Sequence, residues 1–426
     1  GDTLKIHGND ADVSSGVTTY WSYALTALAF AVDHEKEAAA EKWALVTAAP
    51  NYDPETTFHD LPAFGVIPRT PEIPAHILSA TAGEWTAIGT NNVNDVFFDY
   101  VANPPPSGYT IANKNAIMSA WGGAAYAPDR RKLYINGGGH GDYDGNEWYA
   151  FDLVANAWER VNDPALELEE SATLGVFPIS GTPIPIHTYG ILGYSPATQL
   201  AYRLGASGSS LQHFWSLDPD AGEWAEIDTT TTMHDPQAGS AFWNPTRSEF
   251  SIVFKPGSDF ATPHSFDPVS GVQTVESVTG SGTTKAYPAA FSDARQEVLW
   301  ATSGQGADAG ANYGRWNIST NVLSRLYATN PPGISGWAFD EYRGRYVVWS
   351  GSGKTLHYLD GDEIDTNPTT LTWTSETPSG GATPTNAASG GTFNRFQYIE
   401  EYDVFLLVNG ITESVYMFKP SDWRYA

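Results

Sequence analysis

The chain has 426 residues, with 22 basic and 49 acidic side chains, a formal net charge of -27 and no cysteine. This charge balance repels nucleic acids and anionic membrane surfaces. The absence of cysteine excludes disulfides, thiolate metal sites and cysteine nucleophiles. Salt screens the self-repulsion of so acidic a surface, so the composition favours a bacterial, marine source.

The N-terminal segment, residues 1–110, differs from the rest of the chain. Thr26 to Val46 has the pattern of a helix with a charged outer side. The longest apolar stretch, Trp21 to Val32, is shorter than the ~20 residues that cross a bilayer, so we expect a buried helix and no membrane insertion. Because the numbering begins at Gly1 without a methionine, we expect a processed protein that is secreted or periplasmic.

Residues 111–426 contain a repeated pattern of an aromatic residue, a short turn and an alternating apolar strand, mostly about 48 residues apart. Six copies are present, marked by Tyr126, Tyr194, Trp243, Phe291, Phe339 and Tyr398. A glycine-rich break and two further strands follow each copy, as in WYAFDLVANAWERV from Trp148. Four antiparallel strands per repeat are typical of one β-propeller blade.

The glycines after the second strand, the aromatic residue of the third and the tryptophan of the fourth resemble Kelch repeats of the galactose-oxidase-like propellers. The fold class is therefore predicted as all-β, one compact domain with a short N-terminal helical segment. A segment near His76, HILSATAGEWTAIG, looks like the last two strands of another blade. This favours seven blades, one of them degenerate and closed by pairing N- and C-terminal segments. Six blades with an N-terminal extension is the alternative.

The repeat alignment places several polar residues on one rim of the predicted ring. His187 and Tyr189 open the innermost strand of one blade, and His140 lies in a loop of the blade before it. Arg203 heads towards the same rim. We predict these four as catalytic residues, with His140 or His187 as base, Tyr189 as proton donor and Arg203 as carboxylate clamp. Each of these residues also has a purely structural interpretation. The histidines could hydrogen-bond the backbone of a neighbouring blade, Tyr189 could pack between two blades, and Arg203 could pair with an aspartate.

The same rim is predicted to hold substrate-binding residues. These are Trp121, Tyr143, His234 and Lys255, with the two aromatic rings available for sugar stacking. Asp142, Asp144 and Asn146 alternate like the oxygen ligands of a calcium loop, but without its full spacing, and a polar turn explains them equally well. The prediction is therefore no required cofactor, with a structural calcium or other divalent ion as an option at these residues.

Function is chosen by elimination among propeller enzymes. Galactose oxidase chemistry needs a cysteine that this chain lacks, and neither a sialidase arginine triad nor a hydrolase carboxylate pair can be assembled. Histidine, tyrosine and arginine together suit β-elimination of a uronic-acid polysaccharide. In architecture and residue types the chain resembles propeller polysaccharide lyases of the ulvan lyase type. The prediction is a monomeric lyase acting on an anionic polysaccharide; the alternative is a non-catalytic carbohydrate- or protein-binding propeller.

Overall fold

The chain divides into two compact units, Gly1–Glu72 and Ile73–Ala426, and the second is the one described below. The structure, a computed structural model, describes residues 72–425 except 106, 140–141, 167, 172–174, 179–180, 184, 206–213, 228–238, 255–261, 282, 284–287, 303–311, 333–334 and 389–390. The helix expected over Thr26 to Val46 lies outside these residues. Within them, no helix is both long and apolar enough to cross a membrane.

The second unit is a β-propeller of six four-stranded antiparallel sheets, which we number as blades in chain order. Blade 1 contains β2 (Gly123–Ala127), β3 (Lys132–Asn136), β4 (Tyr149–Asp152) and β5 (Ala157–Arg160). Blade 2 contains β8 (Leu192–Ser195), β9 (Leu200–Arg203), β10 (Phe214–Asp218) and β11 (Glu223–Ile227). Blade 3 contains β12 (Ser240–Asn244), β13 (Glu249–Phe254), β14 (Thr262–Asp267) and β15 (Val272–Val275).

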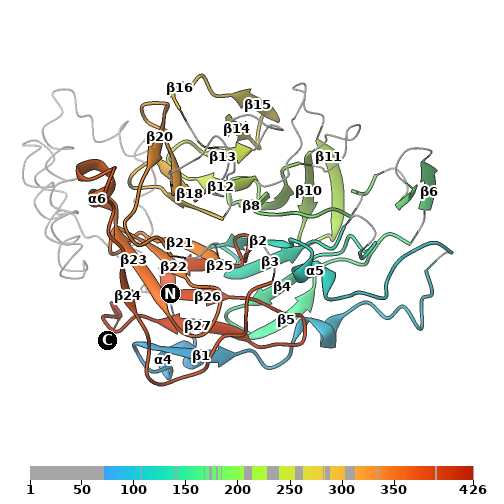
Figure 1. The fold of residues 1–426 in the computed structure, drawn as a ribbon. Helices are drawn as coiled ribbons and strands as arrows, with labels where there is room; N and C mark the ends of the chain where they lie inside the picture. Colours follow the sequence, from blue (N-terminus) through green and yellow to red (C-terminus); the bar gives the residue numbers. More distant parts are fainter. Residues whose placement is uncertain are drawn as a thin grey trace, which may run out of the picture. The chain divides into compact units, whose positions relative to one another are not determined.

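Blades 4 and 5 follow the same plan, and blade 6 ends the chain. Blade 4 contains β17 (Ala289–Ser292), β18 (Glu297–Ala301), β19 (Tyr313–Asn317) and β20 (Val322–Leu326), with β16 (Thr279–Gly280) added in parallel to β20. Blade 5 contains β21 (Gly336–Asp340), β22 (Arg345–Trp349), β23 (Leu356–Asp360) and β24 (Thr374–Glu376). Blade 6 contains β25 (Phe396–Ile399), β26 (Val404–Leu407) and β27 (Val415–Lys419). The first strands β2, β8, β12, β21 and β25 gather near the middle of Figure 1, with β5, β11, β15 and β24 outside.

Few other elements are present in the described residues. They are the hairpin β6 (Leu168–Ser171) and β7 (Gly175–Pro178), the helices α4 (Ala75–Leu78), α5 (Ala116–Ser119) and α6 (Gly361–Thr366), and the 3₁₀ turns η2 (Val93–Val96) and η4 (Glu400–Tyr402).

The six repeat aromatics occupy equivalent positions, as predicted. Each lies in the first strand of its blade and pairs across the hairpin with the residue seven positions later, as Tyr126 does with Leu133 and Phe339 with Tyr346. The other four pairs have the same spacing. Each repeat of the sequence therefore corresponds to one blade of the propeller.

The prediction of seven blades is wrong, because the segment after His76 supplies one strand and not two. Its strand, β1 (Glu84–Ile88), pairs antiparallel with β27 and becomes the fourth strand of blade 6. The N-terminal side of the unit thus closes the ring on its C-terminal strand, as the sequence analysis expected. This pairing covers the outer edge of β27 and makes β1 the outermost strand of blade 6.

Trp85 on β1 anchors this closing strand. Its side chain is 0% exposed, its ring lies 5.4 Å from that of Phe418, and its indole nitrogen donates a 3.0 Å hydrogen bond to the carbonyl of Lys354 in blade 5. The one side chain therefore connects the N-terminal strand, the C-terminal strand and the neighbouring blade.

We predict that Trp85→Ala lowers the free energy of unfolding by about 3–5 kcal/mol, because it opens a cavity at the point where the ring closes. Val101→Ala is the control, since that side chain is 94% exposed. Urea unfolding followed by circular dichroism measures both. A Trp85→Ala protein as stable as the control would show that closure does not depend on this side chain.

Candidate functional site

Three aromatic side chains occupy the same place in three adjacent blades, at one end of the ring axis. Trp121, Tyr189 and Phe393 each lie five residues before the repeat aromatic of blades 1, 2 and 6. Ring centroids are 6.3 Å apart for Trp121 and Tyr189 and 5.5 Å apart for Tyr189 and Phe393. Their backbones share positive φ angles of 54°, 44° and 43°, a conformation that costs a residue with a side chain on the order of 1–3 kcal/mol.

Backbone hydrogen bonds between blades hold this unfavourable conformation. The amide of Tyr189 donates to the carbonyl of Trp121 at 2.7 Å, and the amide of Ala124 donates to the carbonyl of Phe393 at 3.3 Å. Gly123 allows the close approach, because a Cβ there would come within 2.0 Å of the Tyr189 carbonyl oxygen. The three rings are therefore fixed in position by the junctions of the blades.

A histidine and a carboxylate pair beside these rings. Nε2 of His187 lies 3.1 Å from Oδ2 of Asp142, and the two side chains are 11% and 45% exposed. The imidazole centroid lies 4.6 Å from the Trp121 ring and 6.1 Å from the Tyr189 ring. A carboxylate on one imidazole nitrogen fixes the tautomer and orientation of the ring, which is the arrangement that general bases use.

Thr188 fixes the segment that carries this histidine. Its buried hydroxyl accepts a 2.8 Å hydrogen bond from the amide of Gly123 and donates a 2.7 Å bond to the carbonyl of Asn136. Both partners belong to blade 1, so the first residues of blade 2 are tied to the blade that carries Asp142.

Among the predicted site residues, the structure brings together His187, Tyr189 and Trp121. The predicted residues His140, His234 and Lys255 lie outside the described residues.

Arg203 does not share this surface. It is 0% exposed, its guanidinium carbon lies 5.9 Å from the centroid of the Trp224 ring on β11, and burial lowers its pKa to about 9. The side chain thus extends outward along blade 2, away from the first strand.

Tyr143 is also 0% exposed and offers no ring face for a sugar. Its hydroxyl lies 2.8 Å from that of Tyr100 and donates to Oε1 of Glu147, which also accepts a 2.7 Å hydrogen bond from Tyr149. Glu147 is completely buried, and burial raises its pKa above the ordinary range of a glutamate. This tyrosine and glutamate cluster supports the loop that begins at Asp142.

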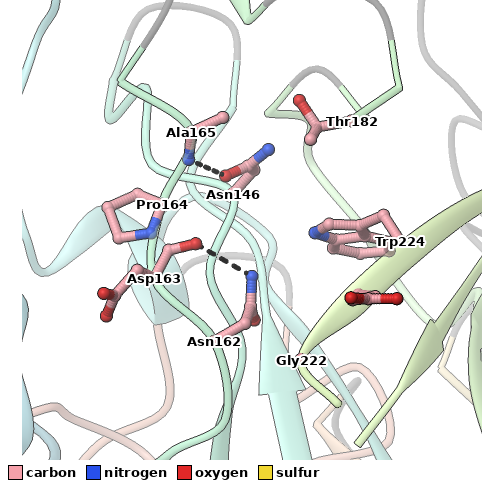
Figure 2. Close-up of a pocket in the computed structure, with 9 residues that line it drawn as sticks. Asn146, Asn162, Asp163, Pro164, Ala165, Thr182, Gly222 and Trp224 are labelled. Atoms are coloured by element: carbon pink, nitrogen blue, oxygen red, sulfur yellow. Dashed lines mark hydrogen bonds between the residues drawn. The ribbon is translucent and has the colours of Figure 1, made fainter.

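The three residues of the predicted calcium loop have separate partners. Asp142 contacts His187, and Oδ2 of Asp144 accepts a 2.6 Å hydrogen bond from the amide of Thr110. Asn146 accepts from the amide of Ala165 at 2.9 Å, as Figure 2 shows, and donates to the carbonyl of Pro183 at 3.0 Å. In the part of the chain that the structure describes, no three histidine or acidic side chains are grouped to hold a metal ion.

Asn146 also lines a hollow of about 330 Å³ between blades 1 and 2. The indole of Trp224 lies across this space from Asn146 (Figure 2), and Asp163, Thr182 and Glu223 also line the hollow. An indole beside amides and carboxylates is a surface that suits a sugar.

The sequence analysis missed two members of the site. Phe393 lies at the repeat position of Trp121 and Tyr189, so aligning the copies five residues upstream of the marker aromatics would have found it. Asp142 was predicted as a metal ligand and instead contacts His187, a pairing between two blades that no local spacing reveals.

Comparison with known proteins adds little to this geometry. No protein-family model and no curated protein matches the chain. Among solved structures, it is similar to hydrazine synthase of Kuenenia stuttgartiensis (TM-score 0.45, 13% identity, 74% of this chain and 99% of that one) and to YjhT (TM-score 0.39, 11% identity, 71% and 93%). It is also similar to TolB of Acinetobacter baumannii (TM-score 0.37, 15% identity), matching 56% of this chain and about half, 51%, of TolB.

We predict that Glu147→Gln makes stability less dependent on pH. A glutamate whose pKa is raised by folding favours the folded state in acid, and that advantage is lost as pH rises from the unfolded pKa through the folded one. Glutamine retains an acceptor for Tyr143 and Tyr149 but cannot ionise. The loss of unfolding free energy between acidic and neutral buffer should therefore be smaller in Glu147→Gln than in the wild type. Equal losses in both proteins would contradict the assignment of a buried, ionisable Glu147.

Proposed function

We propose that the His187 end of the propeller binds an anionic, uronic-acid-containing polysaccharide and cleaves it by β-elimination. The observation that supports this proposal is the His187 and Asp142 pair beside Tyr189 and Trp121. A base held by a carboxylate, a phenol next to it and a flat indole are the groups that this reaction uses. The proposal includes the finer predictions of a Kelch-type, ulvan-lyase-like enzyme that is secreted.

The proposed reaction needs one proton acceptor and one proton donor. His187 takes the proton at C5 of the uronic acid, the electron pair forms the C4–C5 double bond, and the C4–O bond breaks. Tyr189 gives its proton to the departing glycosidic oxygen. The products are one new reducing end and one unsaturated sugar end, with no metal, oxidant or covalent intermediate needed.

The uronic carboxylate must be neutralised for the C5 proton to be acidic enough to leave. Arg203 is not used for this in our proposal, because its side chain is buried against Trp224. The residues that the sequence predicts for this rim, His140, His234 and Lys255, are the proposed source of positive charge and hydrogen-bond donors.

A non-catalytic carbohydrate-binding propeller is the second candidate. The hollow beside Trp224 favours it, since that surface offers stacking and polar groups without the histidine pair. Binding there would require no proton transfer.

We predict that His187→Ala and Tyr189→Phe each lower turnover by about 10²–10⁴-fold on a cleaved polymer, because each removes one proton-transfer group. Asp142→Asn should cause a smaller loss and alter the pH profile, since it keeps the size of the side chain but not the charge that orients His187. Trp121→Ala should mainly raise KM. Turnover is measured as new ultraviolet absorbance from unsaturated sugar ends in a panel of uronic-acid polysaccharides.

His357→Ala on β23 of blade 5 is the matched control, and melting temperatures confirm that each variant is folded. Full activity of both His187→Ala and Tyr189→Phe would eliminate the assigned site. Tight binding of a polymer by the wild type without any cleavage of the panel would favour the second candidate.

A further inference from the structure

A cavity of about 300 Å³ opens at the opposite end of the ring axis from His187. All six repeat aromatics line it, and three of them, Tyr126, Tyr194 and Tyr398, lie towards the far ends of the first strands that Trp121, Tyr189 and Phe393 precede. The cavity is therefore a feature of the whole ring.

Asn394 forms the inner end of this cavity. It is 6% exposed, and its amide nitrogen donates to the carbonyl of Gly190 at 3.0 Å and to that of Ala241 at 3.4 Å. Small residues from the first strands, such as Ala125 and Gly193, leave the space below it open. The aromatic walls thus surround a pocket with a polar floor.

The aromatic side chains of the walls also stabilise the blades themselves. The Phe339 ring lies 4.7 Å from that of Tyr346, and the Tyr398 ring lies 5.0 Å from that of Phe405, so these side chains pack within their own blades. That packing explains why the positions are aromatic. The carboxylates at the opening have structural partners as well: Glu341 accepts hydrogen bonds from the amide of Asp293 at 2.6 Å and the hydroxyl of Ser292 at 3.3 Å. Both of these donor groups are uncharged.

The opening is divided into an apolar half and an acidic half. Two residues after each repeat aromatic, blades 1, 2 and 3 have prolines: Pro128, Pro196 and Pro245. Blades 4, 5 and 6 have carboxylates at the same position: Asp293, Glu341 and Glu400. All but Pro196 line the cavity, and Glu401 adds a further carboxyl on the acidic side.

Every charged residue that lines the cavity is acidic. Nearby arginines bind other groups: Arg295 pairs with Glu297, Asp362 and Asp365, and Arg343 pairs with Asp340, Asp403 and Asp422. Burial, with a contribution from the charge of Glu400, raises the pKa of Glu341 to about 7. The pKa of Glu401 is also raised, mainly by burial. The acidic half therefore has four carboxyl groups and no basic side chain in its lining, and Glu341 gains its negative charge only as the pH rises through about 7.

We propose that this axial cavity binds an organic ammonium ion that carries an apolar group. The acidic half, with Glu341, Glu400 and Asp293, holds the cation, and the apolar group lies against the proline half and Trp243. Aromatic faces around a cation add to the attraction, because the ring quadrupole is negative on its face. The site does not depend on the proposed lyase activity, since it uses none of the same residues.

The test is calorimetric titration of the intact protein with benzyltrimethylammonium, whose charge is independent of pH. We expect saturable binding that benzyl alcohol and benzoate do not reproduce. Affinity should rise as pH increases through about 7, because the carboxyl of Glu341 ionises in that range. The other charged groups of the lining are Asp293 from blade 4 and Glu400 and Glu401 from blade 6, and Asp340 and Arg343 belong to the same hairpin as Glu341. Arg424 donates a hydrogen bond to the carbonyl of Glu400, and the charge of Arg131 lowers the pKa of Glu401.

The double variant Glu341→Gln, Glu400→Gln should bind about tenfold more weakly, because it keeps the shape of the opening and removes two charges. The double variant Glu159→Gln, Glu226→Gln is the matched control, because it removes two charges at exposed positions on β5 and β11 outside the cavity. Trp243→Leu provides a second variant that weakens binding without a change of charge. Equal affinity of the wild type for benzyl alcohol, or unchanged affinity of the double variant, would overturn the proposal.

Discussion

The pairing of β1 with β27 is the interaction on which the rest of this unit depends. Five residue pairs from Glu84 to Ile88 join the N-terminal side of the unit to its last strand. Without them, blade 6 would have three strands and an open edge, and blades 6 and 1 would be linked mainly near the axis. Arg395 completes that central link, since its buried guanidinium donates to the carbonyls of Gly122 at 2.9 Å and Val408 at 2.6 Å. Both ends of the axis are assembled from residues of several blades, so neither exists until the ring is closed.

Closure also accounts for the strained backbone at the His187 end. Tyr189 and Phe393 belong to blades 2 and 6, which have blade 1 between them, yet their rings are in contact. Holding three aromatic residues at positive φ is unfavourable, and the inter-blade hydrogen bonds and ring contacts offset this cost. A strained backbone conformation of this kind is retained only where several contacts hold it, as the hydrogen bonds and ring contacts between blades do here. A rim built in this way presents Trp121 and Tyr189 in fixed positions to a ligand, which reduces the entropy lost on binding.

Features that follow from the repeat, such as the positions of the strands and of the repeat aromatics, could be predicted from the sequence. The directions in which single side chains extend could not. The six repeat aromatics were located correctly because the seven-residue hairpin spacing is local. The number of blades was missed because one strand near Trp85 pairs with a strand more than 300 residues later, and sequence cannot show whether its neighbour is a strand or the short helix α4. Arg203 was placed at the right end of β9, but a long side chain there can extend inward or outward, and here it lies on Trp224. Tyr143 belongs to a loop whose cluster around Glu147 cannot be inferred from composition.

The two ends of the axis differ in what the same repeat places there: the axial cavity has four carboxyl groups in its lining, whereas the His187 end has the His187 and Asp142 pair beside aromatic rings. The proposed binding of an anionic polymer at the His187 end must also be consistent with the overall charge of -27. The positions concerned are seven residues apart along each first strand, from Tyr189 to Pro196 or from Phe393 to Glu400. At about 3.3 Å per residue this separation is at most roughly 23 Å, since only four of the residues form strand, as in β8 (Leu192–Ser195). Charges exposed to solvent at physiological salt are screened over about 8 Å, so the carboxylates at one opening have little influence on a polymer at the other. The carboxylates of the axial cavity therefore do not argue against the polymer binding that we propose for the His187 end. The two proposed sites are compatible within one ring because they lie at opposite ends of the first strands.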